Sequence, residues 1–477
     1  LLMNADDQEK LYENYWLYIE KTLRNKMDYS NLDAFFMQYI VYKTSKPVNS
    51  RQLYNSFVKL FKDSGYSQEN ILKELRYYAE IFGAFVYGSD RYSDRINKLL
   101  YRLRVLNQTT CYPFLLHVFD DYHQGVITEE TVEKILQFIL AYLLRRMVCG
   151  VPSNTLRGLF TYLYNRIFKV ASNKQKYYET LNKFLFTVSS KDVIPSAAEF
   201  ERALQKANIY GNNALCRFLL LDIENGDGKE ILQAENLTIE HIMPQTLSAD
   251  WSHIRPEEHE EYLHTLGNLS VTGYNSELSN KSFAEKRDII RENSKAVILN
   301  SDVLDKESWN VADIQARAKR LAGIVLARYK IERILDDSIE FEYIETLTLD
   351  NYDEVTGKKL VSFELFGETY RQNKYALMLL DVIKLLDKKS PGKLQTLAEN
   401  NYSFNSTKRK HVHLNLDGSG MRWPWKVTDG IYLEANLSAW SCIRFIENLL
   451  AEFGFEKDQF SFNIVAEEPS ETDEDEE

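Results

Sequence analysis

The sequence contains few cysteines and no long apolar run. Its 477 residues include four cysteines, which lie far apart: Cys111, Cys149, Cys216 and Cys442. Their spacing fits neither a zinc knuckle nor the disulfide framework of a secreted domain. The apolar stretch at residues 139–144 is far shorter than the about 20 residues that a membrane helix needs. We therefore expect a reduced, cytoplasmic protein with no membrane span and no signal peptide.

The length and composition predict more than one folded domain. A chain of 477 residues exceeds the usual size of a single domain. Hydrophobic residues make up 44% of the chain, which is enough to form real cores. The first residue is Leu1 rather than Met, as expected of a piece of a longer protein.

The charge is negative overall but unevenly distributed. The net charge is −12, which argues weakly against broad affinity for nucleic acid. Residues 467–477 hold eight acidic side chains and no basic one, so they account for most of this excess. Residues 281–333 are locally basic, with 12 Lys or Arg against 8 Asp or Glu. Because phosphate contact needs only a local basic patch, the overall sign does not exclude DNA.

One segment places a carboxylate beside a histidine and follows them with two asparagines. Glu240 and His241 are adjacent, and Asn268 and Asn275 come next along the chain. An imidazole that titrates near neutrality is suited to removing a proton from water. A hard divalent cation needs few protein oxygens, because it keeps several waters. This set therefore predicts a phosphodiesterase site with one divalent ion, Mg²⁺ or Mn²⁺.

The local pattern around these residues predicts strand, loop, strand and helix. Alternating apolar residues indicate a short strand near residues 237–242 and a second strand at 266–271, where Gly267 allows close backbone approach. Ser282 and Glu285 have the spacing of a capping box that opens a helix. Neighbouring residues on a strand face opposite sides, so Glu240 and His241 can serve one site only near an irregular strand end.

This segment resembles the HNH (His-Me finger) nucleases, and more closely the C-terminal nuclease domain of GmrSD-type, modification-dependent (type IV) restriction endonucleases. The close resemblance covers roughly 60 residues, judged by its motifs. The residues that carry it are Ile239-Glu240-His241-Ile242-Met243-Pro244-Gln245, then Leu266-Gly267-Asn268-Leu269, then Gly273-Tyr274-Asn275-Ser276-Glu277-Leu278-Ser279-Asn280-Lys281.

The resemblance implies a role for each residue of the set. His241 is expected to be the general base, and Asn268 to hold the finger and orient His241. Glu240 and Asn275 are expected to bind the metal ion. Lys281 is expected to contact a DNA phosphate.

Two features leave alternatives open at this site. The family often has histidine at the position of Asn275, and Asn280 is a second candidate for that ligand. His264 lies close to Asn268, and we expect it to pack beside the site rather than to catalyse. His253 and His259 fall in an acidic loop and receive no role.

The sequence predicts a mainly α protein with α+β parts, in three regions and a tail. Residues 1–235 are expected to form a large helical scaffold, with one helix starting at Thr128. Residues 236–334 are expected to hold the ββα-metal (HNH) finger and a following helix from Val311 to Tyr329. Residues 335–466 are expected to form an α+β domain, and the acidic tail 467–477 to be disordered.

Two features outside the predicted nuclease site could contact nucleic acid. The arginines Arg145, Arg146 and Arg157 could line a DNA-facing surface, although exposed arginines are common. In the third region, basic residues 408–410 and the Trp423-Pro-Trp425 motif could grip nucleic acid, but we favour a buried aromatic corner with a solvated basic loop. His411 and His413 lack a third ligand for metal.

The predicted function is a metal-dependent DNA endonuclease that restricts foreign DNA, such as phage DNA with or without modified bases. The alternative is a non-catalytic DNA-binding or regulatory module with a structural finger, and a third option is an RNA-cutting toxin. Proteins with this nuclease domain usually carry an N-terminal ParB-like nucleotide-binding domain. The sequence has neither a Gly-rich phosphate loop nor an Asp-Gly-Gln-Arg type motif, so we expect any such domain on another polypeptide or removed from this one.

Overall fold

A computed structural model gives the structure of the chain, which forms two compact units. The units are Leu1–Glu340 and Phe341–Glu477, and each is described by itself. The structure describes residues 5–24, 30–48, 50–168, 171–187, 192, 194–226, 232, 237–273, 275–336, 338–339, 344–350, 352, 355–404 and 412–465. The predicted boundaries at residues 235 and 334 stay predictions.

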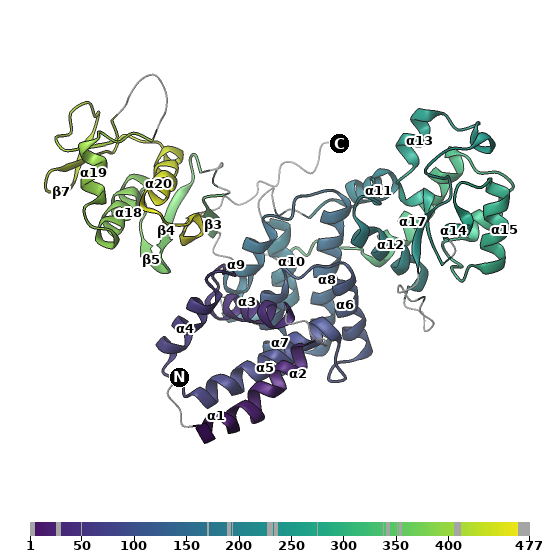
Figure 1. The fold of residues 1–477 in the computed structure, drawn as a ribbon, viewed down its shortest axis with the longest axis horizontal. Coiled ribbons are helices and arrows are strands. Elements are labelled where there is room, and N and C mark those ends of the chain that lie inside the picture. Colours follow the sequence, from purple (N-terminus) through teal and green to yellow (C-terminus); the bar gives the residue numbers. More distant parts are fainter. Residues whose placement is uncertain are drawn as a thin grey trace. The chain divides into compact units, whose positions relative to one another are not determined.

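The first part of unit 1 is helical, as the sequence predicted (Figure 1). Polar N-caps begin several helices: the Thr128 side chain accepts a hydrogen bond from Thr131 N, which confirms the helix predicted to start there. The elements are α1 (Ala5–Leu11), the π-helical turn η1 (Tyr12–Trp16), α2 (Leu17–Leu23), α3 (Ser30–Thr44), α4 (Leu53–Ser64), α5 (Gln68–Tyr87), α6 (Asp94–Val105), α7 (Tyr112–His123), α8 (Glu129–Val148), α9 (Leu156–Phe168), η2 (Ala171–Lys176), α10 (Tyr177–Thr187), α11 (Ala197–Lys206) and α12 (Asn213–Asn225).

A polar cluster lies inside this helical part, around α7. The buried carboxylate of Asp121 accepts hydrogen bonds from the hydroxyls of Tyr164 (2.7 Å) and Tyr177 (2.9 Å) and from Lys174 Nζ (3.0 Å). The His117 ring stacks on Tyr164 with centroids 3.9 Å apart. The buried carboxylate of Asp121 therefore has three hydrogen-bond partners, as a buried charge requires.

The suggested DNA-facing arginines do not share a surface. Arg145 and Arg146 of α8 are buried, and their guanidinium groups donate to main-chain carbonyls of Pro195 and Pro152, respectively. Arg157 is exposed on α9 and donates to the carbonyl of Val48. The predicted DNA-facing surface is therefore wrong for Arg145 and Arg146. Helix α8 directs both side chains inward, where a guanidinium group can donate to several carbonyls at once.

The second part of unit 1 holds the short antiparallel hairpin and the helices around it. The sequence of elements is β1 (Thr238–His241), η4 (Ala249–Trp251), α13 (Pro256–Tyr262), the 3₁₀ turn η5 (Leu266–Asn268), β2 (Leu269–Thr272), α14 (Asn275–Leu278), α15 (Phe283–Asn293), α16 (Ser301–Leu304) and α17 (Val311–Arg328). The second strand is shorter than predicted, because its first three residues form the turn η5. The capping box at Ser282 is present and opens α15, as predicted.

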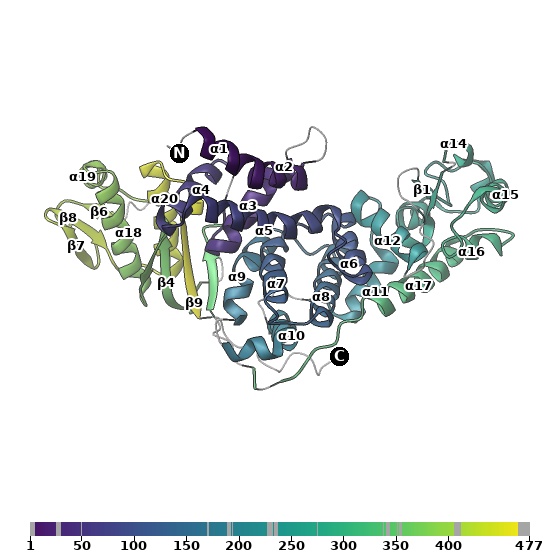
Figure 2. The same cartoon turned by 90° about the horizontal axis from the view of Figure 1, so that it is seen from below.

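Helix α17 connects this part to the rest of unit 1. It packs against η5 and against α11, and it also contacts α12. Figures 1 and 2 both show α11, α12 and α17 together beside the hairpin elements. A core of apolar side chains, including Trp251 and Trp309, is formed by the segment after β1 together with residues of α14, α15, α16 and α17.

Unit 2 has the predicted α+β fold. Its strands form two antiparallel sheets. One sheet has the strand order β3-β9-β4-β5 and the other β6-β8-β7. Apolar residues of α18 and α20 form its core with the inward faces of the strands. The elements are β3 (Ile344–Thr348), β4 (Lys359–Leu365), β5 (Glu368–Arg371), α18 (Tyr375–Lys389), α19 (Lys393–Glu399), β6 (Leu414–Asn415), β7 (Pro424–Thr428), β8 (Ile431–Glu434), α20 (Ala439–Phe453), η6 (Lys457–Gln459) and β9 (Phe460–Val465).

The prediction of a buried aromatic corner in unit 2 is wrong for Trp423, because this residue is 65% exposed. The buried carboxylate of Glu434 accepts hydrogen bonds from the main-chain N–H groups of Arg422 and Trp423, so this turn is held by its backbone and not by burial of the indole. His413 is buried, and its Nδ1 lies 3.1 Å from Ser403 Oγ. The basic residues 408–410, His411 and the tail 467–477 lie outside the described residues.

In the part of the chain that the structure describes, no helix is long and apolar enough to cross a bilayer.

Candidate active site

The hairpin brings three of the predicted site residues, Glu240, His241 and Asn268, to one strand end. Strands β1 and β2 are antiparallel, with Glu240 opposite Ser270 and His241 opposite Leu269. Ile242 N donates to Asn268 O at 2.9 Å, so pairing continues one residue past β1. His241 is the last residue of β1, where the regular alternation of side chains ends.

Asn268 ties the chain after His241 to the chain before β2. Its side chain is fully buried, and Oδ1 accepts a hydrogen bond from Met243 N at 2.7 Å. Its Nδ2 donates to Met243 O (3.0 Å) and Leu263 O (2.9 Å). An amide that bonds both polar groups of one backbone residue fixes that residue firmly. Asn268 is therefore placed to position His241 through the backbone at Met243.

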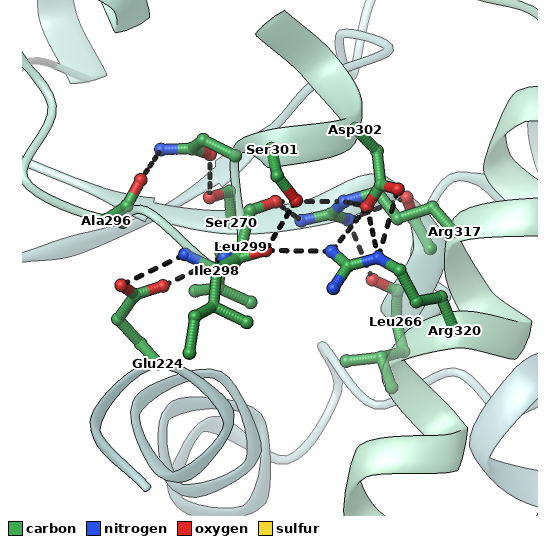
Figure 3. A network of polar contacts seen from close by, with 12 residues as sticks. Glu224, Leu266, Ser270, Ala296, Ile298, Leu299, Ser301, Asp302, Arg317 and Arg320 are labelled. Atoms are coloured by element: carbon green, nitrogen blue, oxygen red, sulfur yellow. Dashed lines mark hydrogen bonds and ion pairs between the residues drawn. The ribbon is translucent and has the colours of Figure 1, made fainter. Parts of the chain in front are cut away.

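The turn that carries Asn268 lies directly against α17. A Cβ on Gly267 would lie 2.1 Å from the carbonyl oxygen of Ile314, so only glycine permits this approach. Arg317 donates to the carbonyls of Leu266 (3.2 Å), Gly267 (2.8 Å) and Leu299 (2.8 Å). Figure 3 shows Arg317 beside Leu266 and Leu299. The turn is thus fixed from the side of α17 as well as by Asn268.

Arg317 lies in the locally basic stretch of residues 281–333, but it does not contribute to a basic surface. Its side chain is completely buried, and burial lowers the pKa of its guanidinium to about 9. Asp302, 3.9 Å away, opposes this shift. The three main-chain carbonyls explain the inward orientation, because a planar guanidinium can donate to several acceptors at once.

A carboxylate from α12 holds the segment that precedes α16. Glu224 accepts hydrogen bonds from the consecutive main-chain N–H groups of Val297 (2.7 Å), Ile298 (3.2 Å) and Leu299 (2.8 Å). Figure 3 shows Glu224 facing Ile298 and Leu299. On the same segment, Asn300 Oδ1 accepts a hydrogen bond from Ser270 Oγ at 2.7 Å. Strand β2 is therefore linked to α12 through a short, fully hydrogen-bonded segment.

The His241 ring is buried between two other polar side chains, those of His264 and Gln245. It is 4% exposed. Its Nε2 lies 3.1 Å from Nδ1 of His264, and its Nδ1 lies 3.3 Å from Nε2 of Gln245. Burial, followed by the nearby His264 and Lys286, lowers the pKa of His241 to about 3. The imidazole is therefore neutral at physiological pH, and its burial opposes the uptake of a proton. Access to Nδ1 also requires Gln245 to move.

Glu240 is paired with a lysine that the motif did not point to. Lys286 Nζ lies 2.6 Å from Glu240 Oε1 and 2.7 Å from the main-chain oxygen of His241. Burial raises the pKa of Glu240 and lowers that of Lys286, and the attraction between the two groups opposes both shifts. Lys286 lies on the buried face of α15 with Phe283 and Ile290, so the helix register set by the capping box was the available signal.

Of the two predicted metal ligands, the structure describes the side chain of Glu240 but not that of Asn275. Among the described residues, no group of three or more His, Cys, Asp or Glu side chains could hold a metal ion. Asn275 begins α14, but its side chain lies outside the described residues. A carboxylate and an amide oxygen suit Mg²⁺ as donors. A cation at Glu240 must share that carboxylate with Lys286 or displace it.

The remaining candidates lie at the edge of this arrangement. Lys281 and Asn280 are exposed, and the main-chain oxygen of Lys281 accepts a hydrogen bond from Trp251 Nε1 at 3.0 Å. His259 Nε2 donates to Pro244 O, and His253 Nε2 donates to Trp309 O, both at 2.9 Å. These two histidines therefore hold the loop between the strands, a role that the sequence did not indicate.

The site is thus a hairpin end with a buried neutral imidazole, a buried ion pair and a fixed asparagine, in a mostly helical unit. Residues 194–324 match a family model described as GmrSD restriction endonucleases, C-terminal domain. This match confirms the resemblance seen in the motifs, because the segment is similar to the C-terminal domain of GmrSD restriction endonucleases. The matched segment begins before α11, so α11 and α12 belong to it along with the hairpin. No curated protein matches the chain.

Proposed function

We propose that the segment 194–324 is an HNH-type endonuclease that hydrolyses phosphodiester bonds in foreign DNA with the help of one Mg²⁺ or Mn²⁺ ion. The observation that carries this proposal is the position of His241 at the end of β1, with Asn268 bonded to the backbone two residues beyond it. The match to a restriction endonuclease family supports the same class of activity.

In this proposal His241 is the general base. It takes a proton from a water molecule, whose oxygen forms a bond to phosphorus while the bond to the leaving oxygen breaks. Asn268 positions the backbone that follows His241. Glu240 and Asn275 would hold the divalent ion, which supplies compensation for the negative charge that develops on the leaving oxygen. Exposed Lys281 would contact a neighbouring phosphate.

A plasmid nicking assay tests this function. The intact chain is incubated with supercoiled DNA and Mg²⁺ or Mn²⁺, and compared with His241→Ala and with the control His253→Ala. We expect cutting by the intact chain and by the control, and a loss of about 10²-fold or more in the His241 variant. Equal cutting by all three proteins would refute the assignment of His241. A parallel RNA substrate tests the toxin alternative.

One observation favours the second candidate, a DNA-binding or regulatory module with a structural finger. The carboxylate of Glu240 is already neutralised by Lys286 inside the protein. If the intact chain binds DNA in a gel-shift assay but does not cut it with either metal ion, the module is the correct function. Its ParB-like partner, on this or another polypeptide, stays a prediction.

A further inference from the structure

Both ring nitrogens of His241 have a side-chain partner, and the two partners differ in what they can do. His241 Nδ1 faces Nε2 of Gln245 at 3.3 Å, and His241 Nε2 faces Nδ1 of His264 at 3.1 Å. A neutral imidazole carries one N–H and one lone pair, so one of the two contacts must be donated and the other accepted.

The direction of the contacts follows from Gln245. The nitrogen of a side-chain amide only donates, so Nδ1 of His241 must accept from it. The proton of the neutral ring is then on Nε2, which donates to His264. Nδ1 of His264 accepts, and His264 in turn carries its own proton on Nε2. With Nε2 of Gln245 facing His241, the hydrogen bonds can therefore run only from Gln245 to His241 and from His241 to His264.

Tyr210 holds the His264 ring in this position. The two rings are stacked, with centroids 5.0 Å apart and an interplanar angle of 6°. The same tyrosine meets the His241 ring edge to face, at 4.6 Å and 70°. Ile209 N also donates to the main-chain oxygen of His264 at 3.2 Å. The loop before α12 therefore fixes both the ring and the backbone of His264.

We propose that His264, held by Tyr210, is a positioning residue that keeps the proton of His241 on Nε2 and its basic lone pair on Nδ1. Its importance for catalysis rests on the proposed nuclease function, whereas the tautomer itself does not. In the other tautomer an N–H would point to the place where the lone pair must accept a proton from water. The long contact with exposed Gln245 leaves Nδ1 available when that side chain turns away.

The tautomer can be measured directly by NMR on the full chain labelled with ¹⁵N-histidine. Long-range ¹H–¹⁵N correlations distinguish a protonated from an unprotonated ring nitrogen, and His241→Ala assigns the signals. We expect Nε2 of His241 to carry the proton. His264→Asn keeps an acceptor near the position of Nδ1 and should preserve this tautomer. His264→Leu removes the acceptor for Nε2 and Tyr210→Ala loosens it, and the exposed Gln245 amide can then turn its oxygen toward Nδ1. Both variants should therefore shift His241 toward a mixture of tautomers.

Cleavage kinetics provide the second readout. His264→Leu should lower kcat by about 10²-fold with little change in KM, and His264→Asn should restore most of the loss. A His241 proton found on Nδ1 in the unmodified protein would overturn the proposal. So would an unchanged tautomer in either His264→Leu or Tyr210→Ala, provided that circular dichroism shows that variant to be folded. If no protein cuts DNA but the tautomers behave as expected, the nuclease function fails and the positioning role stands.

Discussion

Lys286 Nζ lies 2.6 Å from Oε1 of Glu240, and both side chains are almost completely buried. The two residues are 46 positions apart, one on α15 and the other on β1. A buried ion pair contributes little net stability compared with apolar residues, but removing one partner leaves an uncompensated charge. The pair therefore makes the hairpin and α15 depend on each other.

Replacement of Lys286 tests this dependence. We expect Lys286→Met to destabilise the protein by about 3–5 kcal/mol, because Glu240 is left buried without its partner. Lys281→Met, at an exposed position five residues earlier, is the matched control and should change stability by less than about 0.5 kcal/mol. The measurement is the free energy of unfolding in urea. Adding Glu240→Gln to the Lys286 variant should recover part of the loss, and a double variant as unstable as the sum of both single variants would contradict the pairing.

Two glycines near α17 provide a matched pair of substitutions. Gly267→Ala places a Cβ about 2.1 Å from the carbonyl oxygen of Ile314, and it should destabilise the protein by roughly 1–3 kcal/mol or more. Gly323 lies inside α17, where an added methyl group would have no neighbouring atom within 4 Å, and Gly323→Ala should stabilise the helix by about 0.5–1 kcal/mol. Thermal unfolding followed by circular dichroism measures both. Equal effects of the two substitutions would mean that η5 does not lie against α17.

Asn268 is expected to act through the backbone of Met243. Asn268→Ala removes three hydrogen bonds, two of them buried, and should cost about 1–3 kcal/mol of stability. Asn268→Asp keeps the acceptor for Met243 N but places a second oxygen against the carbonyls of Met243 and Leu263. It should therefore be no more stable than the alanine variant. Unfolding in urea tests this order, and an aspartate variant as stable as the unmodified protein would exclude the proposed amide orientation.

The stability of the helical part of unit 1 is expected to fall at acidic pH because of His117. Burial, together with nearby Lys174, lowers the pKa of His117 to about 3 from its ordinary 6.5. In the unfolded chain His117 thus binds a proton near pH 6.5, whereas in the folded chain it binds one only near pH 3. Stability is fully present above pH 6.5 and decreases as the pH falls toward 3, by about 2–3 kcal/mol over the first two pH units.

His117→Phe isolates this contribution, because it keeps the aromatic stacking on Tyr164 and removes the titration. Urea midpoints measured between pH 7 and about pH 4.5 should fall less steeply in the variant. Burial also lowers the pKa of His123, so some acid sensitivity will remain in both proteins. Identical pH profiles for the variant and the unmodified protein would show that His117 titrates normally in the folded state.

Local signals predicted many of the elements correctly. The capping residues Thr128 and Ser282 gave the starts of α8 and α15, because a side-chain cap satisfies N–H groups only a few residues away. The apolar periodicity after Val311 gave α17. The strand expected from Leu266 was partly wrong, since η5 replaces its first three residues. Close packing of Gly267 on Ile314, which no local pattern reveals, accompanies that turn.

The sequence by itself determined the helices, the short hairpin and the residue types at its end, because periodicity, capping and motif spacing are properties of neighbouring residues. The tertiary structure alone decided which charged and polar groups are buried and what they contact. It paired Glu240 with Lys286, turned Arg317 inward and brought Tyr210 to His241. Such contacts join distant parts of the chain, and they form only where packing removes water and each buried polar group finds a partner.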